Sequence, residues 1–342
     1  MRRGACAGVA LAALLVASAP PLPAAQTDLR LLRDRIWFTP APGSLDLQRM
    51  FEAPQEWRRA LDTIQVFKFY QQHTEGASPS VGPNRYDALA RAGAFARLTR
   101  DWGKRIALEA GAVKEFYCTA DESGMREAVR NTQAAIDNVA AAGGLVSYLA
   151  MDEPFIGGLS PWCGRPVMER TADRLHTYMT ALREKNPRLR IGLIEAYPTF
   201  TPAEFRQMLD LMKARGTPAA FLHVDVDLNA LRPGRDAIGR DLIAIADAAA
   251  AHRIPYGVII WGHDGNADAL YAADARRLAN AIHRTFRTWS VMPEHLIFQS
   301  WAESSTGLKI TPSNLPESRP DTHTFLLNDI YRQLRYTVFP RQ

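Results

Sequence analysis

The sequence predicts a single (β/α)₈ TIM-barrel domain, a closed cylinder of eight parallel strands surrounded by helices. Eight short apolar runs rich in Val, Ile, Phe and Tyr recur along the chain, as expected of strands. Stretches with helical periodicity lie between these runs, and strands that alternate with helices favour a parallel sheet. A doubly wound open sheet is the alternative, but no G-x-G-x-x-G motif follows the first run.

The expected strands have the lengths that a barrel requires. They cover residues 35–39, 65–70, 105–110, 145–151, 190–196, 220–227, 256–262 and 295–301. The clearest helical patterns cover residues 124–144, 168–187, 201–216, 267–289 and 324–336. Thr201, Pro202 and Glu204 form a capping-box signature that marks a helix start. The 342 residues, 47% hydrophobic and 23% charged, are ordinary for a globular protein and suffice for one large domain.

Residues 1–25 have the features of a secretory signal peptide. Arg2 and Arg3 precede an apolar stretch at 8–19, and small residues follow, with a cut expected after Ala24 or Ala25. An uncleaved N-terminal anchor is the alternative, although the apolar stretch is short for a membrane span. We therefore expect a catalytic barrel domain at 30–342 in a secreted or periplasmic protein, with no membrane association after cleavage.

Charge and cysteine content narrow the expected partners. The formal net charge is +5 and the basic residues are dispersed, whereas nucleic-acid binding requires a concentrated basic face. We therefore expect no nucleic-acid partner; the sequence does not indicate an oligomeric state. Cys118 and Cys163 follow the third and fourth strands, so neighbouring loops could bring them within disulfide distance in an oxidising compartment. Two unpaired thiols are the alternative.

Polar and aromatic residues gather at the carboxyl ends of the expected strands, where barrels of this kind carry their active sites. The residues expected to bind substrate there are Asp152, Tyr70, Tyr197, Asp225, Trp261, His263, Asp264 and Trp301. The aromatic side chains among them could stack on the C–H faces of sugar rings. Their alternative role is to cap the apolar core of the barrel.

Side-chain alternation predicts which of these residues face the lumen. His223, Asp225 and Asp227 share one face of the sixth strand, which we expect to be the barrel interior near its mouth. Because an unpaired buried carboxylate is costly, structural ion pairing with Lys68 or His223 is the alternative role for such groups.

Side-chain alternation also orients the acidic residues of the fourth and fifth strands. It places Glu195 on one face with Tyr197. It also places Glu153 on one face with Met151, and leaves Asp152 on the opposite face unless the turn rotates it. Two neighbouring strands that each end in a glutamate suggest a shared carboxylate pocket.

A carboxylate pair at a barrel mouth suits the cleavage of glycosidic bonds. One carboxyl group with a raised pKa protonates the leaving oxygen, and the other attacks the anomeric carbon or activates a water. We expect Glu153 to be the acid and Glu195 to be the nucleophile or base. Asp225 and Asp264 are the alternatives for the second role. The distance between the carboxyls separates retaining from inverting mechanisms, and the sequence does not supply it.

The stretch YLAMDEPF at 148–155 resembles the (β/α)₈ glycoside hydrolases of the large retaining clan A. In those enzymes the fourth strand ends in Asn-Glu-Pro, and this glutamate is the acid/base. The resemblance implies that Glu153 is the acid/base and that Asp152 stands where the family's asparagine contacts the sugar 2-hydroxyl. The family's nucleophile is a glutamate at the end of the seventh strand, where this chain has His263 and Asp264 instead.

The sequence therefore predicts a secreted or periplasmic glycoside hydrolase that needs no cofactor and acts on an oligo- or polysaccharide. In α-amylase-like barrels an aspartate on strand four faces a glutamate on strand five, a placement that Asp152 and Glu195 match. One rival is a metal-dependent sugar isomerase or hydrolase that uses His223, Asp225, Glu195 and Glu109. Another rival is a catalytically inactive glycan-binding barrel, since the seventh-strand glutamate is missing.

Overall fold

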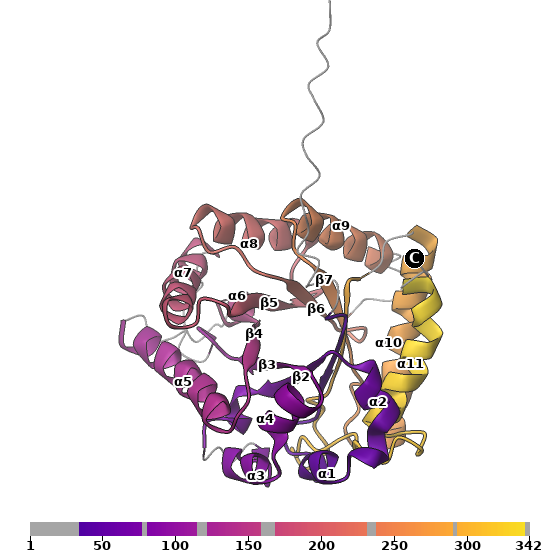
Figure 1. Ribbon diagram of the computed structural model, residues 1–342. Coiled ribbons are helices and arrows are strands. Elements are labelled where there is room, and N and C mark those ends of the chain that lie inside the picture. The colour runs from indigo at the N-terminus through magenta and orange to yellow at the C-terminus, as the bar shows by residue number, and fades with distance from the viewer. Residues whose placement is uncertain are drawn as a thin grey trace, which may run out of the picture.

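The computed structural model describes residues 34–76, 81–114, 122–158, 168–230, 237–289 and 293–338. Eight parallel strands close into a barrel in chain order, and the first strand pairs with the eighth (Figure 1). This confirms the predicted fold class. The proposed signal peptide and the Cys118–Cys163 pair lie outside the described residues, so cleavage and the disulfide stay predictions.

All eight expected strands are present. They are β1 (Ile36–Thr39), β2 (Val66–Tyr70), β3 (Arg105–Ala110), β4 (Val146–Asp152), β5 (Arg190–Tyr197), β6 (Leu222–Val226), β7 (Tyr256–Ile260) and β8 (His295–Gln299). Each strand is buried along most of its length, because helices cover the outer face and side chains fill the lumen.

The long helices form the outer ring in Figure 1. They are α5 (Glu122–Ala141), α7 (Met168–Lys185), α8 (Pro202–Ala214), α9 (Ala237–Ala251), α10 (Asp268–Trp289) and α11 (His323–Val338). Shorter segments are α1 (Leu47–Glu52), η2 (Pro54–Trp57), α2 (Arg58–Thr63), η3 (Gln71–His73), α3 (Tyr86–Arg91), α4 (Ala94–Ala96), η5 (Arg97–Asp101) and α6 (Pro154–Gly158). None of the helices in the described ranges combines the length and apolar character needed to cross a bilayer.

Helix α8 begins where its sequence signature predicts. The Thr201 side chain accepts a hydrogen bond from the Glu204 N–H at 3.3 Å, and the Glu204 carboxylate accepts one from the Thr201 N–H at 2.7 Å. Pro202 occupies the first turn, where its missing N–H costs nothing. The predicted capping box is therefore confirmed.

The lower lumen is filled by large aromatic side chains. The Trp37 ring lies 4.9 Å from Tyr148, 5.4 Å from Phe221 and 4.8 Å from His223, measured between ring centroids. His223 in turn is 2.9 Å from His295 through facing ring nitrogens. Burial lowers the pKa of His223 well below its usual value. This layer closes the floor of the barrel, so any open site must lie above it, toward the strand ends.

Candidate active site

A cavity of about 780 Å³ lies at the carboxyl ends of the strands. Its polar and aromatic lining comes from β2, β3, β4, β6 and β8 and the loops that follow them. These residues are Tyr70, Gln72, Glu109, Lys114, Asp152, Glu153, Asp225, Gln299, Trp301 and Lys309. A volume of this size suits a small ligand or part of a larger one. The predicted site location is therefore occupied by a cavity rich in carboxyl groups.

Lys68, Glu109 and Gln299 form a buried network in the wall of this cavity. The Lys68 ammonium contacts the Glu109 carboxylate and the Gln299 carbonyl oxygen. The Gln299 amide donates to both Glu109 oxygens, at 2.9 and 3.0 Å, and to the Tyr70 hydroxyl at 3.1 Å. Burial raises the pKa of Glu109, and the Lys68 charge opposes this effect. The structural ion pairing considered for Lys68 is therefore observed.

A second charged group joins the ends of β3 and β4. Lys114 Nζ lies 3.0 Å from Asp152 Oδ2 and 2.9 Å from Glu153 Oε2. Burial alone would lower the pKa of Lys114, but the two carboxylates raise it above its usual value. Sequence reasoning missed Lys114; the available signal was a basic residue in the loop directly after the third strand.

Helix α6 lies tightly against the backbone that carries Lys114. A Cβ added to Gly157 would lie 2.9 Å from Lys114 Cα, closer than real Cβ atoms approach. Glycine at this position therefore lets the helix that follows Glu153 pack beside the lysine that pairs with it.

The two acids at the end of β4 do not follow the predicted faces. Asp152 pairs in register with Ile194, and Ile194 pairs with His223 of the lumen floor, so Asp152 faces the lumen. Glu153 follows the strand with a φ of 46°, in the left-handed region that few non-glycine residues adopt. This backbone turn brings Glu153 to the same cavity as Asp152. The two acids therefore share a cavity because the turn rotates the chain, which is the exception that the sequence analysis allowed.

Glu153 is the more protected of these two carboxylates. Its side chain is 19% exposed, against 35% for Asp152. Burial raises the pKa of Glu153, the Asp152 charge adds to the effect, and Lys114 opposes it. A strained backbone at a partly buried carboxylate is a feature that functional sites often carry.

Asp225 faces the lumen as predicted and also lines the cavity. Its Oδ1 atom is buried and has no hydrogen-bond partner among the described residues. Burial raises the pKa of Asp225 well above its usual value, the charges of Glu153 and Asp152 raise it further, and the neighbouring Trp261 indole opposes these effects. This carboxyl group therefore holds a proton under conditions where ordinary aspartates have lost theirs.

Glu195 does not face the lumen, and the prediction that it would is wrong. It pairs in register with Val224, on the outer face of the barrel, whereas its neighbour Ile194 lines the cavity. The Glu195 side chain is fully buried beneath α6, where Oε1 accepts the Phe155 N–H at 2.8 Å. Burial raises the pKa of Glu195 well above its usual value, and the Phe155 hydrogen bond opposes this. These contacts assign it a positioning role for α6.

Replacing Glu195 by glutamine is expected to change kcat/KM by less than about threefold, because the amide oxygen can still accept the Phe155 N–H. The folded state binds the Glu195 proton more tightly than the unfolded chain does. Stability therefore falls as pH rises from about 4.3, the unfolded value, toward the folded one. Thermal unfolding of Glu195→Gln should consequently depend less on pH than that of the wild type between about pH 5 and 8. A loss of activity of about 10³-fold with the fold intact would instead restore a nucleophile role.

Four residues predicted to bind substrate lie outside the cavity lining: Tyr197, Trp261, His263 and Asp264. The Tyr197 hydroxyl donates to Asp241 on α9 at 2.7 Å, so this side chain faces the helices. His263 Nε2 lies 2.7 Å from Asp227 Oδ1. Asp264 accepts the Asn266 N–H at 2.8 Å and shapes the loop after β7.

The two tryptophans at the mouth have different surroundings. Trp301 lines the cavity and is partly exposed, whereas Trp261 is buried and does not line it. Their ring centroids are 4.5 Å apart and the planes are inclined by 32°. Trp261 therefore supports the ring of Trp301 from one side. Tyr70 also lines the cavity, but its hydroxyl donates to the Ser300 carbonyl at 2.7 Å.

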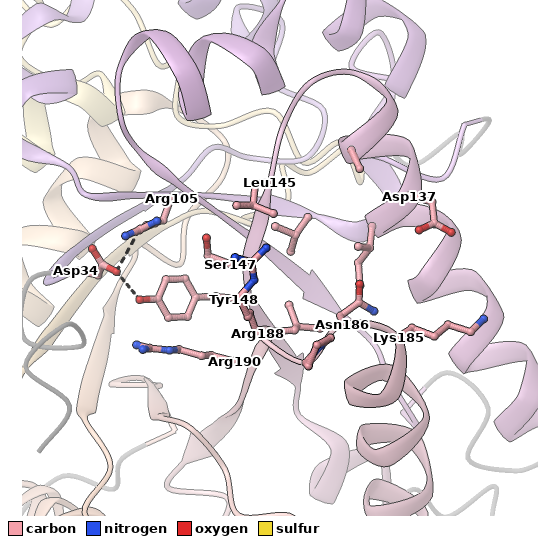
Figure 2. A pocket seen from close by; sticks show the side chains of 15 residues that line it. Asp34, Arg105, Asp137, Leu145, Ser147, Tyr148, Lys185, Asn186, Arg188 and Arg190 are labelled. Carbon is pink, nitrogen blue, oxygen red and sulfur yellow. Dashed lines mark hydrogen bonds and ion pairs between the residues drawn. The ribbon is translucent and has the colours of Figure 1, made fainter.

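A further cavity, of about 480 Å³, lies at the opposite end of the strands. It is lined by the first residues of three strands, among them Arg105 and Arg190, and by Asp34 and Tyr148. Figure 2 shows Arg105 and Arg190 on either side of the Tyr148 ring, whose hydroxyl contacts Asp34. Since the carboxyl groups of the strand ends are at the other mouth, we assign the candidate active site there.

The described residues do not form a ligand set for the metal-dependent alternative. Within the described ranges, no group of three or more His, Cys, Asp or Glu side chains is arranged to hold a metal ion. Of the ligands expected for that alternative, His223 lies in the barrel floor beside His295, and Glu109 pairs with Lys68.

Comparisons with known proteins bear on the fold. No protein-family model and no curated protein matches the chain. Among solved structures, it is similar to a psychrophilic glycoside hydrolase family 10 endo-β-1,4-xylanase, with 11% identity, a TM-score of 0.50 and coverage of 87% of this chain and 98% of that one. It is also similar to a glucosidase from Croceicoccus marinus, with 16% identity, a TM-score of 0.49 and coverage of 88% and 67%. A D-psicose 3-epimerase matches with 13% identity, a TM-score of 0.47 and coverage of 83% and 93%.

The chain is a (β/α)₈ barrel. At 11% identity the similarity to the xylanase shows the fold alone, and one barrel fold carries many chemistries. The chemistry of this barrel therefore depends on the side chains at its mouth.

Proposed function

We propose that this barrel is a glycoside hydrolase whose carboxyl pair is Glu153 and Asp225. The observation that carries the proposal is that both carboxyls line one cavity at the strand ends but differ in their charged neighbours. A cation contacts Glu153, whereas Asp225 has a buried oxygen without a partner in the described part of the chain. Glycosidases need one protonated and one ionised carboxyl, which such a difference provides.

The surroundings assign the roles. Asp225 would hold the proton and donate it to the leaving oxygen, because burial disfavours its ionised form. Glu153 would be the carboxylate that attacks the anomeric carbon or activates water, since Lys114 stabilises its charge. This exchanges the role that the sequence resemblance implied for Glu153. Asp152, beside it in the lumen, would accept a hydrogen bond from a sugar hydroxyl.

Trp301 supports a carbohydrate substrate. Its partly exposed ring lines the same cavity and is held by Trp261, so it can offer a fixed aromatic face to a sugar ring. Replacing Trp301 by alanine is expected to raise KM by about 10- to 100-fold with a smaller effect on kcat, since burying a large apolar side chain against a ligand is worth about 1.5–3 kcal/mol. Steady-state kinetics would check this. A kcat that falls while KM stays unchanged would contradict a binding role.

A glycoside panel tests the proposed function. The wild type should release reducing sugar or nitrophenol from at least one oligosaccharide or aryl glycoside. The Glu153→Gln variant should lose that activity on all these substrates and Asp225→Asn should lose it on the oligosaccharides, while both retain the wild-type circular dichroism spectrum. A panel with no turnover, together with measurable glycan binding, would favour the inactive glycan-binding barrel.

We also propose export to the periplasm or the medium, from the signal-like residues 1–25. N-terminal sequencing of the secreted protein should give a first residue at 25 or 26. A mature protein that still begins with the apolar stretch would support the anchor.

A further inference from the structure

The candidate site has an acidic half and an apolar half. Glu109, Asp152, Glu153 and Asp225 come from β3, β4 and β6. The apolar lining comes mainly from the loops after β1 and β8, which are neighbours on the other side of the barrel. These residues are Pro42, Leu45, Trp301, Leu308 and Ile310.

Two leucines in the apolar half are strongly exposed. Leu45 is 77% exposed and Leu308 is 56% exposed, and both line the cavity. Single exposed leucines are common on protein surfaces, but two that border one cavity beside a tryptophan form a patch. Apolar patches at a concave site mark ligand-binding surfaces.

The loops that carry these leucines are joined by backbone hydrogen bonds. The Gly43 N–H donates to the Lys309 carbonyl at 2.9 Å and links the β1 loop to the β8 loop. Within the β8 loop, the Ser304 N–H donates to the Leu308 carbonyl at 3.0 Å, and the Gly307 N–H donates to the Ser304 carbonyl at 2.8 Å. Leu308 therefore sits on a closed turn that holds it outside the core.

We propose that Pro42, Leu45, Leu308 and Ile310 of the apolar half bind the aglycone of the substrate, that Trp301 contacts the sugar, and that the aglycone is an alkyl or aryl group. The inference rests on the proposed function, because it places the sugar against the acidic half. A glycoside with an apolar aglycone matches both halves, whereas a second sugar would leave its hydroxyls against Leu45 and Leu308. Burying one methylene group is worth about 0.8 kcal/mol, which corresponds to about fourfold in affinity.

The test uses n-alkyl β-D-glucosides and n-alkyl β-D-xylosides with four, six and eight carbons, below their micelle concentrations. Binding is measured by tryptophan fluorescence and by calorimetry on the full chain. Affinity should rise about two- to fourfold for each added methylene group, with either sugar. The double variant Leu45→Ser/Leu308→Ser should lose most of this increment. Leu270→Ser is the matched control, because Leu270 is 48% exposed on α10 and does not line the cavity.

The outcomes separate the two proposals. If binding depends on chain length but no glycoside is hydrolysed, the result would support the apolar site and overturn the proposed function. Hydrolysis with affinities that do not depend on chain length would support the proposed function and overturn the aglycone site. No binding of any alkyl glycoside, or the same increment in the double variant, would overturn the aglycone site. A double variant that loses a wild-type dimer in sedimentation but keeps the increment would assign the leucines to an interface between copies.

Discussion

The Asp225→Asn variant is expected to lose about 10²- to 10⁴-fold in kcat/KM on glycosides with poor leaving groups, because they require protonation of the departing oxygen. On dinitrophenyl glycosides the same variant should lose much less, since that leaving group departs without a proton. Glu153→Gln should lose activity on both substrate types, because the carboxylate acts at the anomeric carbon in each case. Steady-state kinetics on the two substrate types measures the difference.

The pH profile provides an independent check of these roles. In the wild type, kcat/KM should fall at high pH as Asp225 loses its proton, because only the protonated form can donate. This basic limb should be absent from Asp225→Asn. Asp264→Asn is a suitable control, since Asp264 accepts hydrogen bonds from Asn266 and does not line the cavity. If Glu153→Gln loses the basic limb and the leaving-group dependence is reversed, Glu153 is the acid, as the clan A resemblance implied.

The Lys68→Met variant is expected to lose about 3–5 kcal/mol of unfolding free energy, because it leaves the buried Glu109 carboxylate without its cation. The Lys68 and Glu109 side chains are 0% and 5% exposed, so solvent cannot replace the missing charge. Because the Lys68 charge would no longer oppose the effect of burial, the pKa of Glu109 would rise further and its protonated form would be favoured. Chemical denaturation at neutral pH measures the change.

Two variants make the Lys68 experiment decisive. Arg58→Met removes the exposed arginine that pairs with Asp62, with side chains 70% and 63% exposed, and should leave stability unchanged within error. The double variant Lys68→Met/Glu109→Gln should recover part of the loss, because no unpaired buried charge remains. A Lys68→Met protein as stable as Arg58→Met would show that the network contributes nothing.

Much of the site could be placed from the sequence because of the geometry of parallel strands. All strands of such a barrel end at one mouth, so the residues that follow them are gathered there whatever the details of packing. This is why Tyr70, Asp152, Glu153, Asp225 and Trp301 were correctly expected to be neighbours. The same argument could have included Lys114, which follows the third strand.

The fifth strand shows why orientation could not be predicted in the same way. Gly192, Ile194 and Ala196 alternate with Leu193, Glu195 and Tyr197, and both sets are largely apolar. Strands of a parallel barrel are buried on both faces, so composition does not indicate which set faces inward. The register decides: a Cβ on Gly192 would lie 2.4 Å from the Phe221 ring of the lumen.

The sequence by itself determined the eight alternating strands and helices, the start of α8 and the mouth at which the acids gather, because these depend on local periodicity and chain direction. Only the tertiary structure decided which acids share the cavity. The left-handed backbone at Glu153, the burial of Glu195 beneath α6 and the contact of Lys114 with two carboxylates all depend on residues distant in sequence. A carboxyl group's role follows from its charged and apolar neighbours, and packing alone brings those neighbours together.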